Sequence, residues 1–257
     1  MKILAIGDIT SPKGVEHLSA RLWKFRERHG IDLCIANGEN ASFITGISAP
    51  LAEKLLRSGV DCITGGNHTM QNRQAYTFLD ECGEILRPIN YGDSAPGRGA
   101  ALIDAAGRRA LVINALGCVH IEPTLDSPYP YIDRALEEYR GKYDFAIIDF
   151  HAEATGEKLA LGHAYDGLVS VVFGTHTHVM TADAQILPRG TGYITDLGMC
   201  GESGGVLGMS SECVVSRMRT RLPHRFVPSE GECVADGVIF TLDDSSYKTV
   251  ATESVHF

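Results

Sequence analysis

The chain has 257 residues, of which 44% are hydrophobic and 21% are charged. These proportions are typical of a globular protein with a sizeable core, which we expect to form a single domain over residues 1–257. The formal net charge of −9 argues against salt-driven binding to duplex nucleic acid, which needs clustered Lys and Arg. A small phosphate ligand remains compatible with this charge if a metal ion supplies a local positive centre.

Cysteine usage and the first residues of the chain indicate a soluble, cytoplasmic protein. The seven cysteines are odd in number and include no Cys-x-x-Cys pair, so a reducing compartment is the simplest account. The opening stretch MKILAIGD holds an apolar run too short for the core of a signal peptide or for a membrane span. We therefore expect no membrane partner.

The first third of the chain alternates short apolar runs with helical patterns. Apolar residues recur at helical spacing up to Gly30, and Pro50 and Gly59 mark the start and the end of a second helix. The remaining runs predict three strands, at Lys2–Gly7, Ile31–Ala36 and Val60–Thr64.

In the rest of the chain, predicted strands and helices continue to alternate and are followed by predicted hairpins. Helices are predicted at Gln71–Glu81, Tyr131–Arg140, Ala154–Leu161 and 211–218, and loops at 83–99 and 198–208. Strands are predicted at Ala101–Asp104, Ala110–Asn114, Tyr143–Phe150, 168–173, Ala184–Leu187, Gly192–Thr195, 237–242 and 246–251. This order predicts an α/β fold with a mixed sheet covered by helices on both faces, and a small lid within 69–135.

Side chains suited to metal binding follow five of the apolar runs. In open α/β sheets, ligands bind outside the carboxyl ends of the strands, so these side chains converge if the strands are parallel neighbours. Oxygen and imidazole donors without thiolate suit manganese, iron or zinc. There are too many donors for one tetrahedral ion, and they suit two ions that share a bridging carboxylate. The side chains are Asp8, Glu39 with Asn40, Asn67 with His68, His151, and His176 with His178.

The set resembles the signature of the calcineurin-like metallophosphoesterase superfamily, with its blocks at Asp8, Asn67-His68, His151 and Gly174-Thr-His-Thr-His178. Two positions depart from that signature. Thr10 stands where a histidine is usual, and Asn37-Gly-Glu-Asn40 replaces the block of the bridging aspartate. With H-A-E-A-T at 151–155, these departures closely resemble the bacterial 2′,3′-cyclic-nucleotide 2′-phosphodiesterase family, over nearly the whole chain.

The resemblance implies a four-layer α/β/β/α sandwich with mixed sheets. It also implies hydrolysis of 2′,3′-cyclic nucleotides to 3′-nucleotides by a metal-bridging hydroxide, with His68 as the general acid for the departing ribose oxygen. Two metal ions are implied, iron or manganese first, with zinc or magnesium as alternatives. The implied ligands are Asp8, Glu39, Asn40 and His178 for the first ion, and Glu39, Asn67, His151 and His176 for the second.

The chemistry asks for these residue types independently of the family. Two cations lower the pKa of a bound water enough to supply hydroxide near neutrality, and a poor alkoxide leaving group needs a proton from a group such as His68. Gly65 and Gly66 are expected to let the backbone approach the metals. Gly174 is expected to let the strand end turn inward, so that His176 and His178 reach one ion each.

Other interpretations remain open. The same site could serve a 3′,5′-cyclic phosphodiesterase or a phosphomonoesterase, and a non-catalytic metal-bound nucleotide sensor is a third alternative; a homo-oligomer is also left open. Gly201-Glu-Ser203-Gly-Gly205 fits the nucleophile elbow of α/β-hydrolases, but too many glycines surround it for a strand-to-helix turn. Asp196 could orient a metal-binding histidine or simply form a turn. We assign structural or surface roles to His17, His29, His120, His163, His224 and His256.

Overall fold

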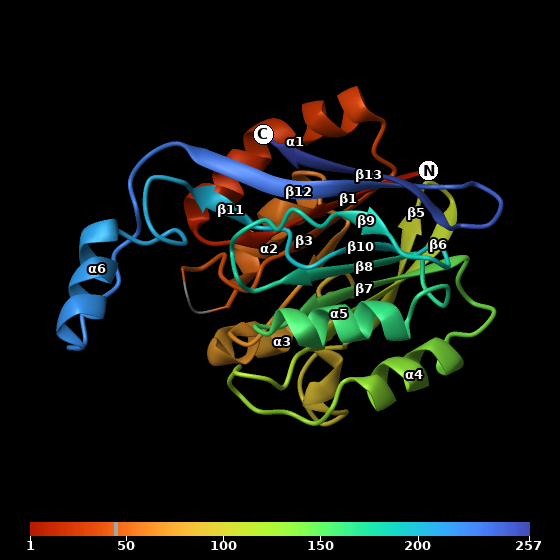
Figure 1. Ribbon diagram of the computed structural model, residues 1–257, viewed down its shortest axis with the longest axis horizontal. Helices are drawn as coiled ribbons and strands as arrows, with labels where there is room; N and C mark the ends of the chain where they lie inside the picture. The colour runs from red at the N-terminus through yellow and green to blue at the C-terminus, as the bar shows by residue number, and fades with distance from the viewer. Residues whose placement is uncertain (44–45) are drawn as a thin grey trace.

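The computed structural model describes residues 1–43 and 46–257. Two β-sheets lie face to face, and helices cover the outer face of each (Figure 1). The first sheet has the strand order β2-β11-β12-β1-β3-β4, with β13 paired to β12, and the second has the order β5-β6-β7-β8-β10-β9. The α/β/β/α sandwich that the family resemblance implies is confirmed.

The elements have the following bounds. The first sheet contains β1 (Lys2–Ile6), β2 (Asp8–Ile9), β3 (Leu33–Asn37), β4 (Cys62–Thr64), β11 (Met199–Glu202), β12 (Cys233–Leu242) and β13 (Thr249–His256). The second contains β5 (Ala100–Ala105), β6 (Arg108–Leu116), β7 (Phe145–His151), β8 (Val171–Thr175), β9 (Gln185–Ile186) and β10 (Gly192–Ile194). The helices are α1 (Pro12–His29), α2 (Ala49–Arg57), α3 (Tyr76–Glu81), α4 (Tyr129–Glu138), α5 (Thr155–Ala164) and α6 (Ser211–Thr220). Three 3₁₀ turns are η1 (Thr69–Gln71), η2 (Arg73–Ala75) and η3 (Ile89–Tyr91).

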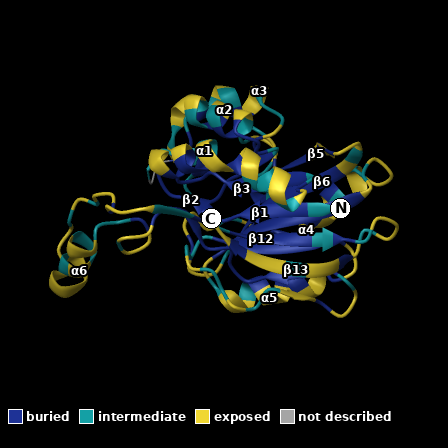
Figure 2. Cartoon of the chain, turned by 90° about the horizontal axis from the view of Figure 1, so that it is seen from above, coloured by how far each residue is buried: buried dark blue, intermediate teal, exposed yellow. Residues whose placement is uncertain are grey.

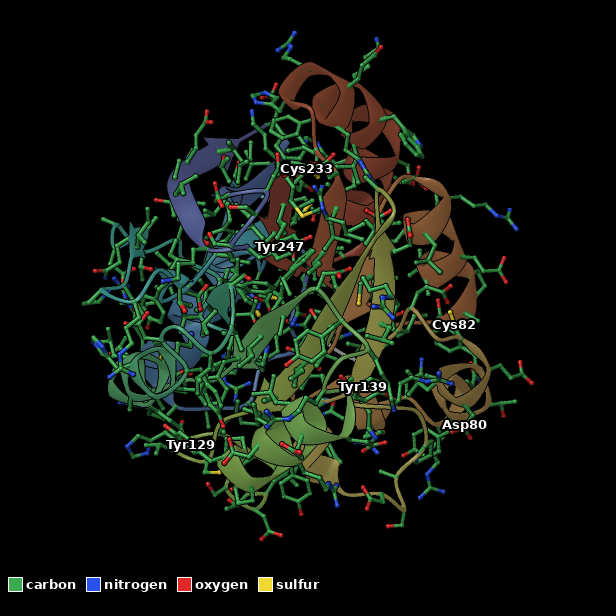
Figure 3. The ribbon with its side chains drawn as sticks, turned by 90° about the vertical axis from the view of Figure 1, so that its right-hand side faces the viewer. Asp80, Cys82, Tyr129, Tyr139, Cys233 and Tyr247 are labelled. Atoms are coloured by element: carbon green, nitrogen blue, oxygen red, sulfur yellow. The ribbon has the colours of Figure 1, made fainter. Side chains whose placement is uncertain are left out.

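Three apolar layers hold the sandwich together, and β1 shows how the sequence builds them. Successive side chains of a strand point to opposite faces. Leu4 accordingly packs in the layer beneath α1 and α2, whereas Ile3 packs between the two sheets. Tyr129 and Tyr139, at the two ends of α4 in Figure 3, pack in the third layer, on the outer face of the second sheet. Most strands are buried along their length, whereas β9 and most of β13 are exposed, as are the outer faces of the helices (Figure 2).

Helix α1 begins and ends where its capping residues predict. The Ser11 side chain accepts a hydrogen bond from the Gly14 N–H at 3.3 Å, and Pro12 occupies the first turn, where no N–H is needed. Gly30 ends the helix in the left-handed conformation, with φ of 66°. This helix packs over β11 and β12 and leads the chain to β3.

The donor-bearing strands run parallel but belong to two sheets, so the expectation of a single mixed sheet is wrong. β1, β3 and β4 are parallel neighbours in the first sheet, and β7 and β8 are parallel neighbours in the second. The carboxyl ends of all five strands meet because the sheets are stacked face to face. The crevice therefore lies between the two layers.

Several predicted elements differ in extent from the structure, and three of the differences are informative. The helix predicted from Gln71 begins only at Tyr76, because the Asn72 side chain accepts from the Gln74 N–H at 3.1 Å and holds a turn there. The loop predicted at 198–208 contains β11, which pairs with β12. The last strand starts at Thr249 rather than at 246, because Asp243 accepts from the N–H groups of the next turn.

The interval 69–135, in which we expect a small lid, includes β5, β6 and α4. These parts of the interval belong to the sandwich itself. By contrast, α6 stands away from the sandwich at the end of an arm (Figures 1 and 2). Among the helices of the described residues, none is both long and apolar enough to cross a membrane.

Candidate metal centre

The side chains predicted to bind metal come together with His68, the predicted general acid, where the two sheets meet. Hydrogen bonds and close polar contacts connect all of them into one cluster, although they come from five strand ends. The members are Asp8, Glu39, Asn40, Asn67, His68, His151, His176 and His178.

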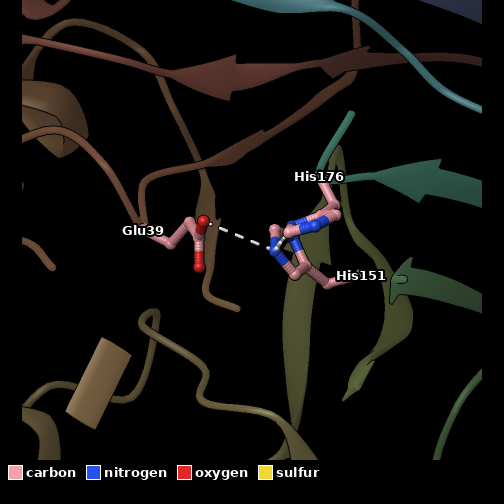
Figure 4. Close-up of side chains that lie close together, drawn as sticks. All are labelled: Glu39, His151 and His176. Atoms are coloured by element: carbon pink, nitrogen blue, oxygen red, sulfur yellow. Dashed lines mark hydrogen bonds and ion pairs between the residues drawn. The ribbon is translucent and has the colours of Figure 1, made fainter. Parts of the chain in front are cut away.

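One half of the cluster surrounds the Nε2 atom of His151. Three donor atoms lie around it: Asn67 Oδ1 at 3.0 Å, His176 Nδ1 at 3.1 Å and Glu39 Oε1 at 3.4 Å. Figure 4 shows Glu39 facing the two imidazoles across a short gap. Ligand atoms of Glu39, His151 and His176 all lie within 4.8 Å of one another, which is the spacing of groups that can share one ion.

A buried relay fixes the orientation of His151. Its Nδ1 lies 2.9 Å from the hydroxyl of Thr175, and that hydroxyl donates to Asp149 at 2.7 Å. Because the Thr175 proton goes to Asp149, the Thr175 oxygen accepts from Nδ1–H, which turns the Nε2 atom toward the cluster. Thr175 was not among the predicted site residues; its place before His176, on the strand that pairs with β7, was the only signal.

The other half of the cluster lies around Asp8. The Oδ1 atom of Asp8 is buried, and no hydrogen-bond donor among the described residues reaches it. His178 Nε2 lies 3.7 Å away and His151 Nδ1 lies 3.8 Å away. The Nε2 atom of His178 also lies 3.4 Å from Asn40 Nδ2. An orphaned, buried carboxylate oxygen facing imidazole nitrogens is the donor chemistry that a divalent cation satisfies, so the residues present fit a metal ion here.

The charges of the centre are strongly coupled. Burial by itself would raise the pKa of Glu39, but the charge of His151 prevails and lowers it to about 2. Burial by itself would lower the pKa of His151, yet Glu39 and Asp8 raise it to about 9. Burial raises the pKa of Asp8 well above its ordinary value, while burial and the nearby His151 charge lower the pKa of His176 to about 3. Glu39 thus carries a negative charge at neutral pH, and His176 is neutral, which is the form in which an imidazole can bind a metal ion.

Backbone geometry brings the donors this close. A Cβ atom on Gly66 would lie 2.3 Å from Glu39 Oε2 and 2.5 Å from His151 Nε2, so only glycine fits there. This confirms the close approach expected of Gly66. The role expected of Gly174 is wrong: it lies within β8, and a Cβ there would meet the Thr195 carbonyl at 1.9 Å.

The inward turn instead comes from the histidines themselves. His176 and His178 have φ angles of 108° and 61°, in the region that favours glycine. Such strain persists only where the surroundings hold it, and it is concentrated at functional sites. The Thr177 N–H between them donates to Asp196 at 3.0 Å, and Asp196 pairs with the buried Lys158 at 2.7 Å. The Asp196 carboxylate thus supports this loop by binding the backbone N–H of Thr177, and it does not bind either imidazole ring directly.

Ser203 does not form a nucleophile elbow. It follows β11, but no helix of the described residues begins between it and Ser211, and its hydroxyl donates to the carbonyl of Glu232 at 3.0 Å. Among the histidines without a predicted site role, His17 bonds the Phe257 carbonyl at 2.8 Å and His256 pairs with Asp236 at 2.7 Å. For both of these, the structural role is confirmed.

Comparison with known proteins places the chain in a family. Residues 4–255 match the family described as YmdB-like protein. The chain belongs to the YmdB-like protein family. It is 41% identical, over 99% of its length and 96% of the relative, to the 2′,3′-cyclic-nucleotide 2′-phosphodiesterase of Bacillus subtilis strain 168. It is 31% identical, over 99% of its length and 92% of the relative, to a putative phosphatase/phosphodiesterase of Mycoplasma pneumoniae.

Solved structures agree with this membership. A hypothetical protein from Thermus thermophilus superposes with a TM-score of 0.92 at 36% identity, covering 100% of this chain and 99% of that one. A 5′-nucleotidase described as putative, from Staphylococcus aureus, has a TM-score of 0.58 at 17% identity and covers 99% of this chain and 53% of that one. At that identity the likeness establishes a shared fold alone.

Proposed function

We propose that this protein hydrolyses 2′,3′-cyclic nucleotides to 3′-nucleotides at a centre of two metal ions. The observation that carries the proposal is the division of the donors into two sets that meet at Glu39. One set surrounds His151 Nε2 and the other surrounds Asp8 Oδ1. The chain is a metal-dependent phosphoric ester hydrolase, given its family and its full-length similarity to a named phosphodiesterase.

The two donor sets support the following assignment of ligands. Glu39 would bridge, since its Oε1 atom lies 3.4 Å from His151 Nε2 in one set and also accepts from the amide of Asn40, in the other set, at 2.8 Å. The first ion would be held by Asp8, Glu39, Asn40 and His178, and the second by Glu39, Asn67, His151 and His176. When bound, the ions supply a nucleophilic hydroxide near neutral pH and positive charge for the phosphate. Iron or manganese is the proposed metal, as the family resemblance implies, and oxygen and imidazole donors without thiolate are compatible with both.

We assign to His68 the delivery of a proton to the departing 2′-oxygen. Its Nδ1 lies 2.8 Å from Asn40 Oδ1, and its backbone N–H donates to Glu39 at 2.9 Å. Its side chain is 24% exposed and lines the cavity over the centre. If Nδ1–H donates to Asn40, a protonated ring presents its second N–H, on Nε2, to a substrate in this cavity. Asn40 therefore orients the proton donor in addition to its proposed role as a ligand.

The first test is the loss of the proton donor. We expect His68→Ala to lower kcat for 2′,3′-cyclic AMP by roughly a hundredfold or more while metal content stays at the wild-type level. Metal content is measured by elemental analysis on protein purified without added metal. An unchanged kcat at normal metal content would refute the role of His68.

The second test concerns the substrate class. Rates on 2′,3′-cyclic AMP, 3′,5′-cyclic AMP and 3′-AMP are compared in one preparation. The proposal expects the 2′,3′-cyclic diester to be preferred and 3′-AMP to accumulate as the product. Faster turnover of the 3′,5′-cyclic diester or of the monoester would favour the alternatives, and binding without turnover in Mn²⁺ or Fe²⁺ would favour a sensor.

A further inference from the structure

An arm of the chain stands opposite the metal centre. It leaves the sandwich after β11, carries α6 at its far end and returns at β12 (Figure 1). Helix α6 has no buried residue, although it carries apolar side chains such as Val214 and Met218. Packing against the sandwich therefore does not explain why these apolar side chains are there.

A cavity of about 540 Å³ lies between the arm and the metal centre. One wall carries residues of the centre, among them His68 and His178, and the other wall belongs to the arm. The arm wall is apolar apart from one cation and consists of Val206, Leu207, Met209, Val214, Arg217, Met218 and Phe226. The volume lies within the range of small-molecule sites, roughly 300–1,000 Å³.

A flat stacking surface is formed by two residues of this wall. The Arg217 guanidinium carbon lies 4.8 Å from the centroid of the Phe226 ring. Aromatic faces backed by arginine are the surfaces on which nucleic-acid bases stack, and they tolerate every base because each has a π-face. Arg217 also brings positive charge to the mouth of a site on a chain whose net charge is −9.

We infer that Leu207, Val214, Arg217 and Phe226 bind the nucleoside part of the substrate whose phosphate occupies the metal centre. This inference rests on the proposed function, because it takes the substrate to be a cyclic nucleotide. The phosphate and the base of such a molecule are joined through one ribose. A ligand held at the centre by its phosphate therefore extends its base into the same cavity, toward the arm. The arm recognises the nucleoside and the centre recognises the ester.

Two substrates with the same reacting ring separate these roles. The 2′,3′-cyclic AMP molecule and glycerol 1,2-cyclic phosphate both contain a five-membered cyclic diester, but only the first has a base. We expect Phe226→Ala and Arg217→Ala each to lower kcat/KM for 2′,3′-cyclic AMP roughly tenfold, mainly through KM. The rate on glycerol 1,2-cyclic phosphate should stay within about twofold of the wild type. Val215→Ala, an exposed change on α6 outside the cavity wall, is the matched control and should alter neither rate.

Calorimetry gives a readout that does not depend on turnover. Binding of 3′-AMP should weaken in Phe226→Ala, whereas binding of inorganic phosphate should match the wild type. Equal losses on both substrates, or an unchanged affinity for 3′-AMP, would overturn the inference. Failure of the proposed function has a different signature, since wild-type protein would then hydrolyse neither cyclic diester; the calorimetric comparison still decides whether the arm binds a nucleoside.

Discussion

The Nδ1 atom of His151 and the hydroxyl of Thr175 lie 2.9 Å apart on paired positions of two parallel strands. Thr175 donates its own proton to the buried Asp149 at 2.7 Å. The ring of His151 is therefore held with Nε2 facing Glu39 and His176. Two neighbouring strands of the second sheet thus fix the orientation of one side chain of the candidate metal centre.

Thr175→Val keeps the shape of the side chain and removes the hydroxyl. We expect metal affinity to fall roughly 10–100-fold, because the partner that orients a ligand histidine is lost. The measurement is a metal titration monitored by calorimetry. Thr252→Val, on β13, is the control and should bind metal like the wild type. Unchanged affinity in Thr175→Val would show that the relay does not orient the ligand.

Asp8→Asn should have opposite effects on the stability of the metal-free protein and on metal binding. Burial raises the pKa of Asp8 well above its ordinary value. Above the pKa of an unfolded aspartate, the folded metal-free protein must therefore hold a proton that the unfolded chain has released, and its stability falls as the pH rises. At pH 7.5 we expect the variant to melt at a higher temperature than the wild type when both are chelated. The increase in Tm on adding Mn²⁺ should shrink, because a ligand is lost. A lower Tm of the chelated variant would contradict this account.

Metal uptake should release a proton from His151. The pKa of this group in the protein alone is raised to about 9 by Glu39 and Asp8, which outweigh burial. It is therefore protonated at pH 7, whereas a metal ligand must be deprotonated. Affinity is expected to rise with pH up to about 9 and then to level off. Calorimetry at pH 7 in two buffers of different ionisation enthalpy measures the released protons, and identical heats in both buffers would contradict the prediction.

The stability of the chelated protein should also depend on the ionisation of His151. It should fall as the pH rises, whereas metal affinity rises. Because the folded pKa of His151 is raised, its contribution to stability is fully present below about 6.5 and is lost as pH rises through about 9. Thermal melts of chelated protein across this range report the loss. His151→Gln removes the group, so the part of the pH dependence between pH 6.5 and 9 that comes from His151 should disappear in that variant.

Gly66→Ala places a methyl group between two ligands. The added Cβ would meet Glu39 Oε2 at 2.3 Å and His151 Nε2 at 2.5 Å, so the donors must move apart. A displacement on the order of 1 Å lowers rates about a hundredfold, which is the loss expected in kcat/KM. Gly156→Ala, in α5, meets nothing within 4 Å and should keep full activity. Wild-type rates in Gly66→Ala would show that activity does not require the close approach of residue 66 to Glu39 and His151.

The sequence by itself determined the helices, most of the strands and the candidate donors of the proposed centre. Periodicity and capping are local, so α1 between Ser11 and Gly30 could be predicted from neighbouring residues alone. The donors were recognisable because polar groups suited to metals followed one apolar run after another. The strand β11 was missed because it lies in a glycine-rich stretch, 198–208, whose local preference is weak, and pairing with β12 decides its conformation.

Only the tertiary structure decided how the donors are shared between two sheets and what supports them. The relay from His151 through Thr175 to Asp149 joins two strands, and the fit of Gly66 depends on atoms of Glu39 and His151 far away in the chain. The facing of Phe226 and Arg217 toward the centre likewise depends on the path of the arm. Such contacts depend on distances between remote segments, and no local pattern of residues contains them.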